Sequence, residues 1–85
     1  MRQARLSLSD AFSLVVKKRR EESGISRAAL ARLAGLHQTY IGLLERGERS
    51  PNLDTANAIA QALSKSLEEM VAEAGKLQAG SKRKM

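Results

Sequence analysis

The sequence predicts an all-α domain, a compact bundle of five short helices. Apolar residues recur at the three- and four-residue spacing of amphipathic helices, and no segment shows the β-branched alternation of a strand. The sole proline, Pro51, lies in a turn, where its fixed φ and missing donor do no harm. The 85 residues suffice for one small domain with a modest core.

The first helix is predicted over residues 9–23. Ser9 can cap its start by accepting a backbone hydrogen bond, and Gly24 can supply the left-handed residue that ends it. We expect residues 1–8 to form an N-terminal arm, because they have little to bury. One face of the helix carries, at helical spacing, Phe12, Val15, Val16 and Arg19.

Two shorter helices are predicted at residues 27–34 and 38–46, separated by a turn at Gly35. Ser26 caps the start of the first, and Gly47 stops the second. Their inward-facing residues are predicted to be Leu30, Leu33, Ala34, Ile41 and Leu44.

A fourth helix is predicted after Asn52 and a fifth after Ser66, because both residues are good N-caps. The folded domain is expected to span residues 9–77, and residues 78–85 to form a basic disordered tail. The apolar stripes of the last two helices are Leu53, Ala56, Ile59, Ala60 and Leu63, then Leu67, Met70, Val71 and Ala74.

Composition argues against several functional classes. The chain has no cysteine, one histidine and no apolar run of the roughly 20 residues that a membrane span needs. We therefore expect a cytoplasmic protein without a metal site, a cofactor or a small-molecule ligand. The sequence contains no paired acids, nucleophile–base set or phosphate-cradling glycine loop, so we do not expect an enzyme.

The positive charge is unevenly distributed. The net charge is +6, yet residues 54–73 hold four acidic side chains against one lysine. The excess of arginine and lysine thus lies outside this window, which predicts that one side of the molecule meets a polyanion.

The predicted helices at 27–34 and 38–46 form the arrangement of DNA-binding helix-turn-helix proteins, because the second carries uncharged hydrogen-bonding side chains. The sequence also resembles the lambda-repressor-like, Cro-type (XRE) helix-turn-helix family. The resemblance covers about residues 12–71 and is carried by RREESGISRAALARLAGL and YIGLLERGERSPNLDTANAIAQAL. It implies a bundle of about five helices that binds double-stranded operator DNA as a homodimer.

The resemblance implies which side chains read DNA bases, namely Gln38, Thr39 and Leu43, with Tyr40 beside them. Glutamine can pair in a bidentate way with adenine, threonine can donate, accept or offer its methyl, and leucine can contact a thymine methyl. An alternative stays open for each of two residues. The Tyr40 ring could pack on the bundle while its hydroxyl reaches a phosphate. Leu43 could be an exposed apolar residue without a special role.

The resemblance also implies phosphate contacts, which fix the register of a protein on the duplex while base contacts carry sequence. His37 is expected to be an N-cap or a phosphate neighbour, and the alternative is a proton switch. In this family an arginine late in the first helix pairs with a glutamate at the end of the recognition helix, positions held here by Arg20 and Glu45. The implied phosphate-binding residues are Arg27, His37, Arg46 and Arg49.

Three residues depart from the family pattern. Arg19 stands where many members have an apolar residue, so its stem lies along the core with its head in solvent, or that edge packs more loosely. Ala29 replaces the glutamate that would complete a capping box with Ser26. Gly42 lies within the recognition helix at a cost of about 1 kcal/mol, and could allow close approach to the DNA groove.

The sequence thus predicts a sequence-specific regulator of transcription that acts as a homodimer on a palindromic operator. It is most similar to restriction-modification controller proteins and to short phage or plasmid repressors. It would repress by covering promoter elements or activate by touching RNA polymerase. The alternative is an antitoxin that binds a toxin protein and uses DNA binding for autoregulation. The dimer interface is expected on the fifth helix, at Leu67, Met70, Val71 and Ala74. The alternative is that Leu67, Met70 and Val71 only complete the core of the bundle.

Overall fold

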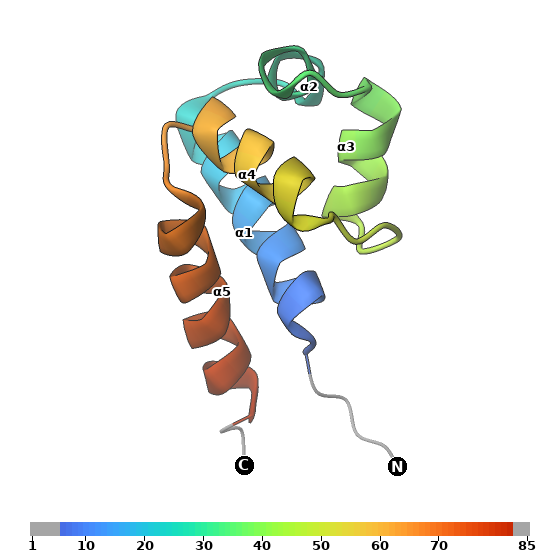
Figure 1. The fold of residues 1–85 in the computed structure, drawn as a ribbon. Helices are drawn as coiled ribbons and strands as arrows, with labels where there is room; N and C mark the ends of the chain where they lie inside the picture. Colours follow the sequence, from blue (N-terminus) through green and yellow to red (C-terminus); the bar gives the residue numbers. More distant parts are fainter. Residues whose placement is uncertain (1–5, 83–85) are drawn as a thin grey trace.

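The computed structural model describes residues 6–82, which fold into five helices without a strand (Figure 1). This architecture confirms the predicted all-α class. In chain order the helices are α1 (Leu8–Ser23), α2 (Arg27–Ala34), α3 (Gln38–Glu45), α4 (Leu53–Ala62) and α5 (Leu67–Lys82).

Side-chain caps fix most helix starts. Ser26 accepts a hydrogen bond from the backbone N–H of Ala29 at 3.0 Å, and Asn52 accepts one from Thr55 at 2.8 Å. The cap of α1 is Ser7 rather than the predicted Ser9, because the extended Ser7 accepts a bond at 3.0 Å from the N–H of Asp10. Ser9 already lies inside the first turn of α1.

Glycines in the left-handed conformation close three of the helices. Gly24 ends α1 with φ 72° and Gly35 ends α2 with φ 74°. At the end of α3, Gly47 has φ 77°, and the N–H of Glu48 bonds to the carbonyl of Leu43 at 2.8 Å. This is a Schellman motif, so the chain leaves α3 along a fixed path.

The capping box that α2 lacks is present at the start of α5. The N–H of Glu69 bonds to Ser66 Oγ at 3.0 Å, and the N–H of Ser66 bonds to Glu69 Oε1 at 2.8 Å. The bond from the Ser66 backbone lowers the pKa of the Glu69 carboxyl. The start of α5 is therefore well defined, and its acidic first turn stabilises it further because carboxylates there complement the helix dipole.

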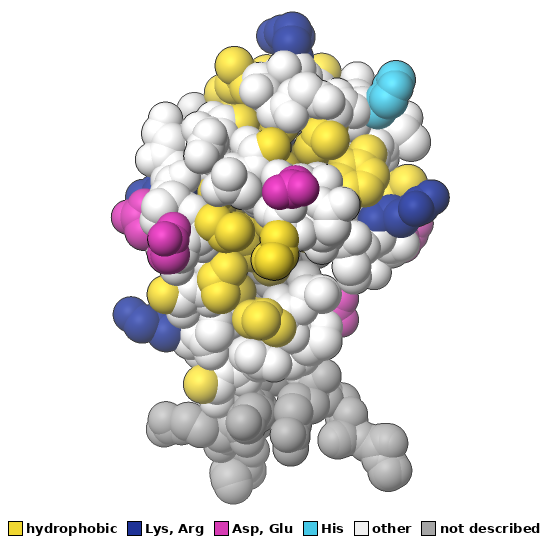
Figure 2. Space-filling model, viewed as in Figure 1, with side chains coloured by type: hydrophobic (Ala, Val, Ile, Leu, Met, Phe, Trp, Pro, Cys, Tyr) yellow, Lys and Arg dark blue, Asp and Glu magenta, His cyan; other side chains and the backbone are white. Residues whose placement is uncertain are grey.

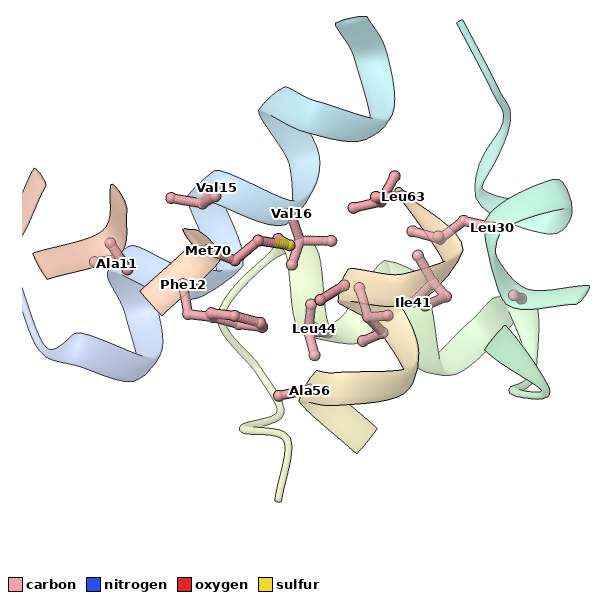
Figure 3. Packing of buried hydrophobic residues seen from close by; sticks show 14 residues of the cluster. Ala11, Phe12, Val15, Val16, Leu30, Ile41, Leu44, Ala56, Leu63 and Met70 are labelled. Atoms are coloured by element: carbon pink, nitrogen blue, oxygen red, sulfur yellow. The ribbon is translucent and has the colours of Figure 1, made fainter. Parts of the chain in front are cut away.

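The helices form two associated parts. α5 lies along α1, and α2 packs against both α3 and α4 (Figure 1). Apolar side chains from all five helices form one core between these parts (Figure 3). Its buried members are Ala11, Phe12, Val15, Val16, Leu30, Ala31, Ile41, Leu44, Ala56, Ile59, Ala60, Leu63, Met70 and Ala74.

Two residues predicted for the dimer interface belong to this core instead. Met70 and Ala74 are both fully buried within the subunit, and Met70 points into the cluster beside Val16 (Figure 3). Because they cannot reach a partner chain without leaving the core, the prediction that they lie in an interface is wrong. Leu67 is half-buried and Val71 is exposed, so these two remain available.

Two leucines predicted to face inward are exposed. Leu33 is 63% exposed because α3 and α4 cover α2 on the side of Leu30 and Ala31. Leu53 is 77% exposed because it is the first residue of α4, where no preceding turn covers it.

Arg19 takes neither of the two expected arrangements. Its Nε and Nη2 lie 2.9 and 2.8 Å from Glu73 Oε1, so the guanidinium joins α1 to α5 as a half-buried ion pair. Lys18 approaches the same carboxylate at 3.6 Å. The polar edge of the α1–α5 contact is therefore held by charge rather than loosely packed.

The predicted C-terminal tail is partly helical. α5 continues to Lys82, so the expectation that disorder begins at residue 78 is wrong for residues 78–82. Leu77, Gln78 and Ala79 are good helix formers, and the single Gly80 costs only about 1 kcal/mol, so the helix continues. Residues 1–5 of the predicted arm and 83–85 of the predicted tail lie outside the described residues.

Candidate nucleic-acid interface

Helix α3 presents one face to the core and another to solvent. Ile41 and Leu44 are fully buried, whereas Gln38 and Thr39 are exposed at the start of the helix. Leu43 is half-buried one turn after Thr39, on the same outward face. The structure therefore brings the three predicted base-reading side chains together on one solvent-facing surface.

Tyr40 lies at the flank of this surface. Its ring packs partly buried against the core. Burial raises the pKa of the Tyr40 hydroxyl, while the positive charge of Arg49 acts in the opposite direction. Tyr40 is thus a protonated, hydrogen-bonding group near a cation, and its ring supports α3 at the same time.

His37 precedes α3 and occupies its N-cap position, but its side chain makes no capping hydrogen bond. The imidazole is exposed. The proposed N-cap role is therefore limited to the backbone, and the ring is available to other groups.

Glu45 joins three helices at the end of α3. Arg20 donates to its carboxylate through Nε at 2.6 Å and Nη2 at 3.1 Å, which is the ion pair that the family resemblance implies. Arg27, the first residue of α2, donates to Glu45 Oε1 through Nε at 2.9 Å. The hydrogen bonds to Glu45 raise the pKa of the Arg20 guanidinium. The buried carboxylate therefore fixes the ends of α1 and α3 and the start of α2.

Arg46 folds back along α3. Its Nε bonds to Glu48 Oε2 at 3.2 Å, and both side chains are exposed. A Cβ added at Gly42 would lie 3.4 Å from Arg46 Nη1. The space beside Gly42, which we expected to favour close approach to DNA, is thus occupied by the guanidinium of Arg46.

This geometry predicts the effect of replacing Gly42 by alanine. Gly42 does not adopt a left-handed conformation, and the neighbouring atom is the end of a flexible side chain. Alanine should therefore raise the free energy of unfolding by about 0.5–1 kcal/mol through its higher helix propensity. Urea unfolding followed by circular dichroism measures this change. A loss of stability would mean that Arg46 cannot move aside.

The sequence did not indicate two of these contacts. The sequence predicts a phosphate contact for Arg27, and nothing in it indicates the hydrogen bond to Glu45. The pairing of Glu48 with Arg46 was likewise not predicted. Arg46 and Glu48 are two residues apart across the end of a helix, a spacing that does not determine where their side chains point. Arg27 and Glu45 are 18 residues apart, and only the fold brings them together.

Between residues 6 and 82 no helix has the length and apolar character to cross a membrane. Over the same residues, no three acidic or histidine side chains gather in a way that could hold a metal ion.

Comparison with known proteins identifies the fold. The helix-turn-helix family model HTH_3 matches residues 16–70. Control protein C.SmaI of Serratia marcescens is 38% identical over 60 residues, which is 71% of this chain and 71% of C.SmaI.

Two solved structures are similar as well. The restriction-modification controller protein C.AhdI of Aeromonas hydrophila has a TM-score of 0.69 and 33% identity, covering 74% of this chain and 94% of C.AhdI. The P22 c2 repressor, solved with synthetic operator 9T, has a TM-score of 0.64 and 29% identity, covering 69% of this chain and 89% of the repressor. The chain therefore belongs to the lambda-repressor-like, Cro-type helix-turn-helix family.

Proposed function

We propose that the protein is a sequence-specific DNA-binding regulator of transcription, which acts as a homodimer on a palindromic operator. The surface of α3 carries this proposal, because uncharged hydrogen-bonding side chains occupy its exposed start, Arg46 and Arg49 follow its C-terminal end, and Arg27 of α2 binds Glu45 there. The similarity to the P22 c2 repressor in its operator complex supports DNA as the ligand. The similarity to C.SmaI and C.AhdI favours a controller protein.

In this proposal α3 enters the major groove. Gln38 pairs with an adenine edge, Thr39 donates to or accepts from a base, and Leu43 meets a thymine methyl. Tyr40 lies beside them with its hydroxyl directed to a base or a phosphate. The phosphates are contacted by Arg27, His37, Arg46 and Arg49.

The homodimer would form through an apolar groove where α1, α4 and α5 meet. Figure 2 shows hydrophobic side chains gathered at the centre of this face. Leu8 and Val71 are exposed within the groove, and Leu53 projects from its edge. Apolar surface concentrated in this way is typical of interaction sites. The groove is lined by Leu8, Ser9, Phe12, Pro51, Leu53, Ala56, Leu67 and Val71.

A two-fold dimer would place its two α3 helices in successive major grooves, about 10 base pairs or roughly 34 Å apart. Bound dimers would repress by covering promoter elements, or activate from an adjacent site by touching RNA polymerase. The level of dimer would set the response, because dimerisation depends on protein concentration.

Selection from random duplexes with the purified protein tests this function. We expect enrichment of a two-fold symmetric sequence whose half-sites lie about one helical turn apart. The variant Gln38→Ala should bind but lose its preference at one position in each half-site. Failure of the wild-type protein to enrich any sequence would contradict the proposed function, and an unchanged preference in Gln38→Ala would remove that residue from the base-reading set.

Arg49→Ala tests the phosphate contacts separately. We expect it to weaken binding to all duplexes by a similar factor and to reduce the slope of log K against log salt by about 1, because one phosphate neutralisation is lost. Fluorescence anisotropy at several salt concentrations measures both quantities. A loss confined to one base position would assign Arg49 to base reading instead.

A further inference from the structure

Two arginines of the proposed phosphate-binding set are held in the same way. Arg27 donates to Glu45 through Nε at 2.9 Å, and Arg46 donates to Glu48 through Nε at 3.2 Å. Within residues 6–82, neither guanidinium makes a side-chain hydrogen bond through its terminal Nη atoms. Each glutamate thus accepts from Nε of its arginine and leaves the edge formed by Nη1 and Nη2 for another acceptor.

The two glutamates differ in how firmly they are held. The Glu45 side chain is 1% exposed, and two bonds from Arg20 fix its orientation. The Glu48 side chain is 55% exposed, and Arg46 is its one ion-pair partner among the described residues. A fixed carboxylate can fix the guanidinium that binds it, whereas an exposed pair exchanges with water and contributes little.

The charges of the Glu45 cluster leave Arg27 free to attract an anion. Arg20, Arg27 and Glu45 together carry one net positive charge, and the exposed Glu21 approaches Arg20 alone, at 3.9 Å. Arg27 is the more exposed of the two cations. The surplus charge therefore lies at the start of α2, on the solvent side of the cluster.

We propose that Glu45 is a positioning residue for DNA binding, in addition to its role in the ion pair with Arg20. By holding Nε of Arg27, it directs the two Nη atoms outward as a preformed fork for a backbone phosphate. This inference rests on the proposed function, since it needs a DNA ligand. It follows that the pair Arg20–Glu45 couples the core to the first turn of α2, and not only to the end of α3.

Arginine is required at residue 27 if this inference is right. A guanidinium can bind a carboxylate with Nε and a phosphate with its Nη edge at once, because its donors lie in one plane. A lysine has one ammonium on a flexible stem, so a hydrogen bond to Glu45 does not orient a planar pair of donors toward the phosphate. When a side chain is no longer ordered before binding, its ordering must occur on binding, which weakens affinity by about tenfold.

The test compares Arg27→Lys with the matched variant Arg46→Lys on the selected operator duplex. Arg27→Lys should weaken binding about tenfold, and Arg46→Lys at most about threefold, because Glu48 is too exposed to orient its partner. Both variants keep the net charge, and urea unfolding should show that both remain folded. Equal losses in the two variants would overturn the inference while leaving the proposed function intact.

A double-mutant cycle supplies an independent test of Glu45. Glu45→Gln should weaken operator binding in the Arg27 protein but leave it unchanged in the Arg27→Ala protein, when affinity is corrected for the folded fraction. An equal effect in both backgrounds would show that Glu45 acts only through the fold, and would overturn the inference. If Glu45→Gln fails to fold, the comparison of Arg27→Lys with Arg46→Lys still tests the inference. Absence of duplex binding by the wild-type protein would overturn both this inference and the proposed function.

Discussion

Arg20→Met should lower the free energy of unfolding by about 3–5 kcal/mol, the typical cost of removing one partner from a buried ion pair. The Glu45 carboxylate stays behind in the core with one remaining bond, from the half-exposed Arg27. A domain of 85 residues is stable by only about 4–13 kcal/mol in total. The loss is therefore a substantial part of the total stability, and Arg20→Met should unfold at a clearly lower urea concentration and temperature than the wild-type protein. Urea and thermal unfolding, followed by circular dichroism, measure the loss.

Two further variants show how much of the lost stability comes from the unpaired Glu45 carboxylate and how much from the missing Arg20 side chain. The double variant Arg20→Met/Glu45→Leu should recover most of the stability, because no unpaired charge remains buried. Lys18→Met removes an exposed partner of Glu73 at 3.6 Å and should cost less than about 1 kcal/mol. If the double variant is no more stable than Arg20→Met, the cost arises from packing and not from the uncompensated carboxylate.

The features that follow from local chemistry were predicted from the sequence. Ser26 and Asn52 cap their helices, and Gly35 takes the left-handed conformation, because each depends only on residues within one turn. The five helices were found because their periodicity is a local property as well. The error at Ser7 is also local, since two serines two residues apart are equally good caps.

Periodicity indicates that a helix has an apolar face, but not which element covers it. Met70 and Leu67 occupy the same predicted stripe, yet only Met70 is buried by α1. Leu53 belongs to an apolar stripe and is exposed, because the fold supplies no neighbour at that end of α4. These outcomes depend on helix packing angles, which a single sequence does not contain.

For the candidate interface, the sequence predicts which residues lie on the outer face of α3, but not the contacts between different helices. The positions of Gln38 and Thr39 on the outer face of α3 follow from helix geometry. The contact between Arg27 and Glu45 could not be predicted, because it joins residues on different helices through a carboxylate whose burial comes from the fold. Which bases these side chains contact stays a prediction.

In the proposed homodimer, Leu53→Glu should give a monomer and lower the affinity for the proposed palindromic operator by roughly 100-fold or more, because the two half-sites are no longer bound as a linked pair. Leu53 is 77% exposed in the subunit, so the change removes no core contact. An acidic residue in the first turn of α4 is also favourable for the helix dipole. The expected defect is therefore in association and not in folding. Sedimentation equilibrium measures the dimerisation, and fluorescence anisotropy measures the affinity for the operator.

A matched control distinguishes this face from the rest of the surface. Leu14 is 46% exposed on α1 but lines a different groove, beside Lys18 and Leu77, so Leu14→Glu should remain dimeric. On a duplex with a single half-site, Leu53→Glu should bind as well as the wild-type monomer, because α3 is unchanged. A dimer that persists in both Leu53→Glu and Val71→Glu would move the interface away from the groove between α1, α4 and α5. A monomer that still binds the palindrome at full affinity would instead show that the two half-sites are read independently.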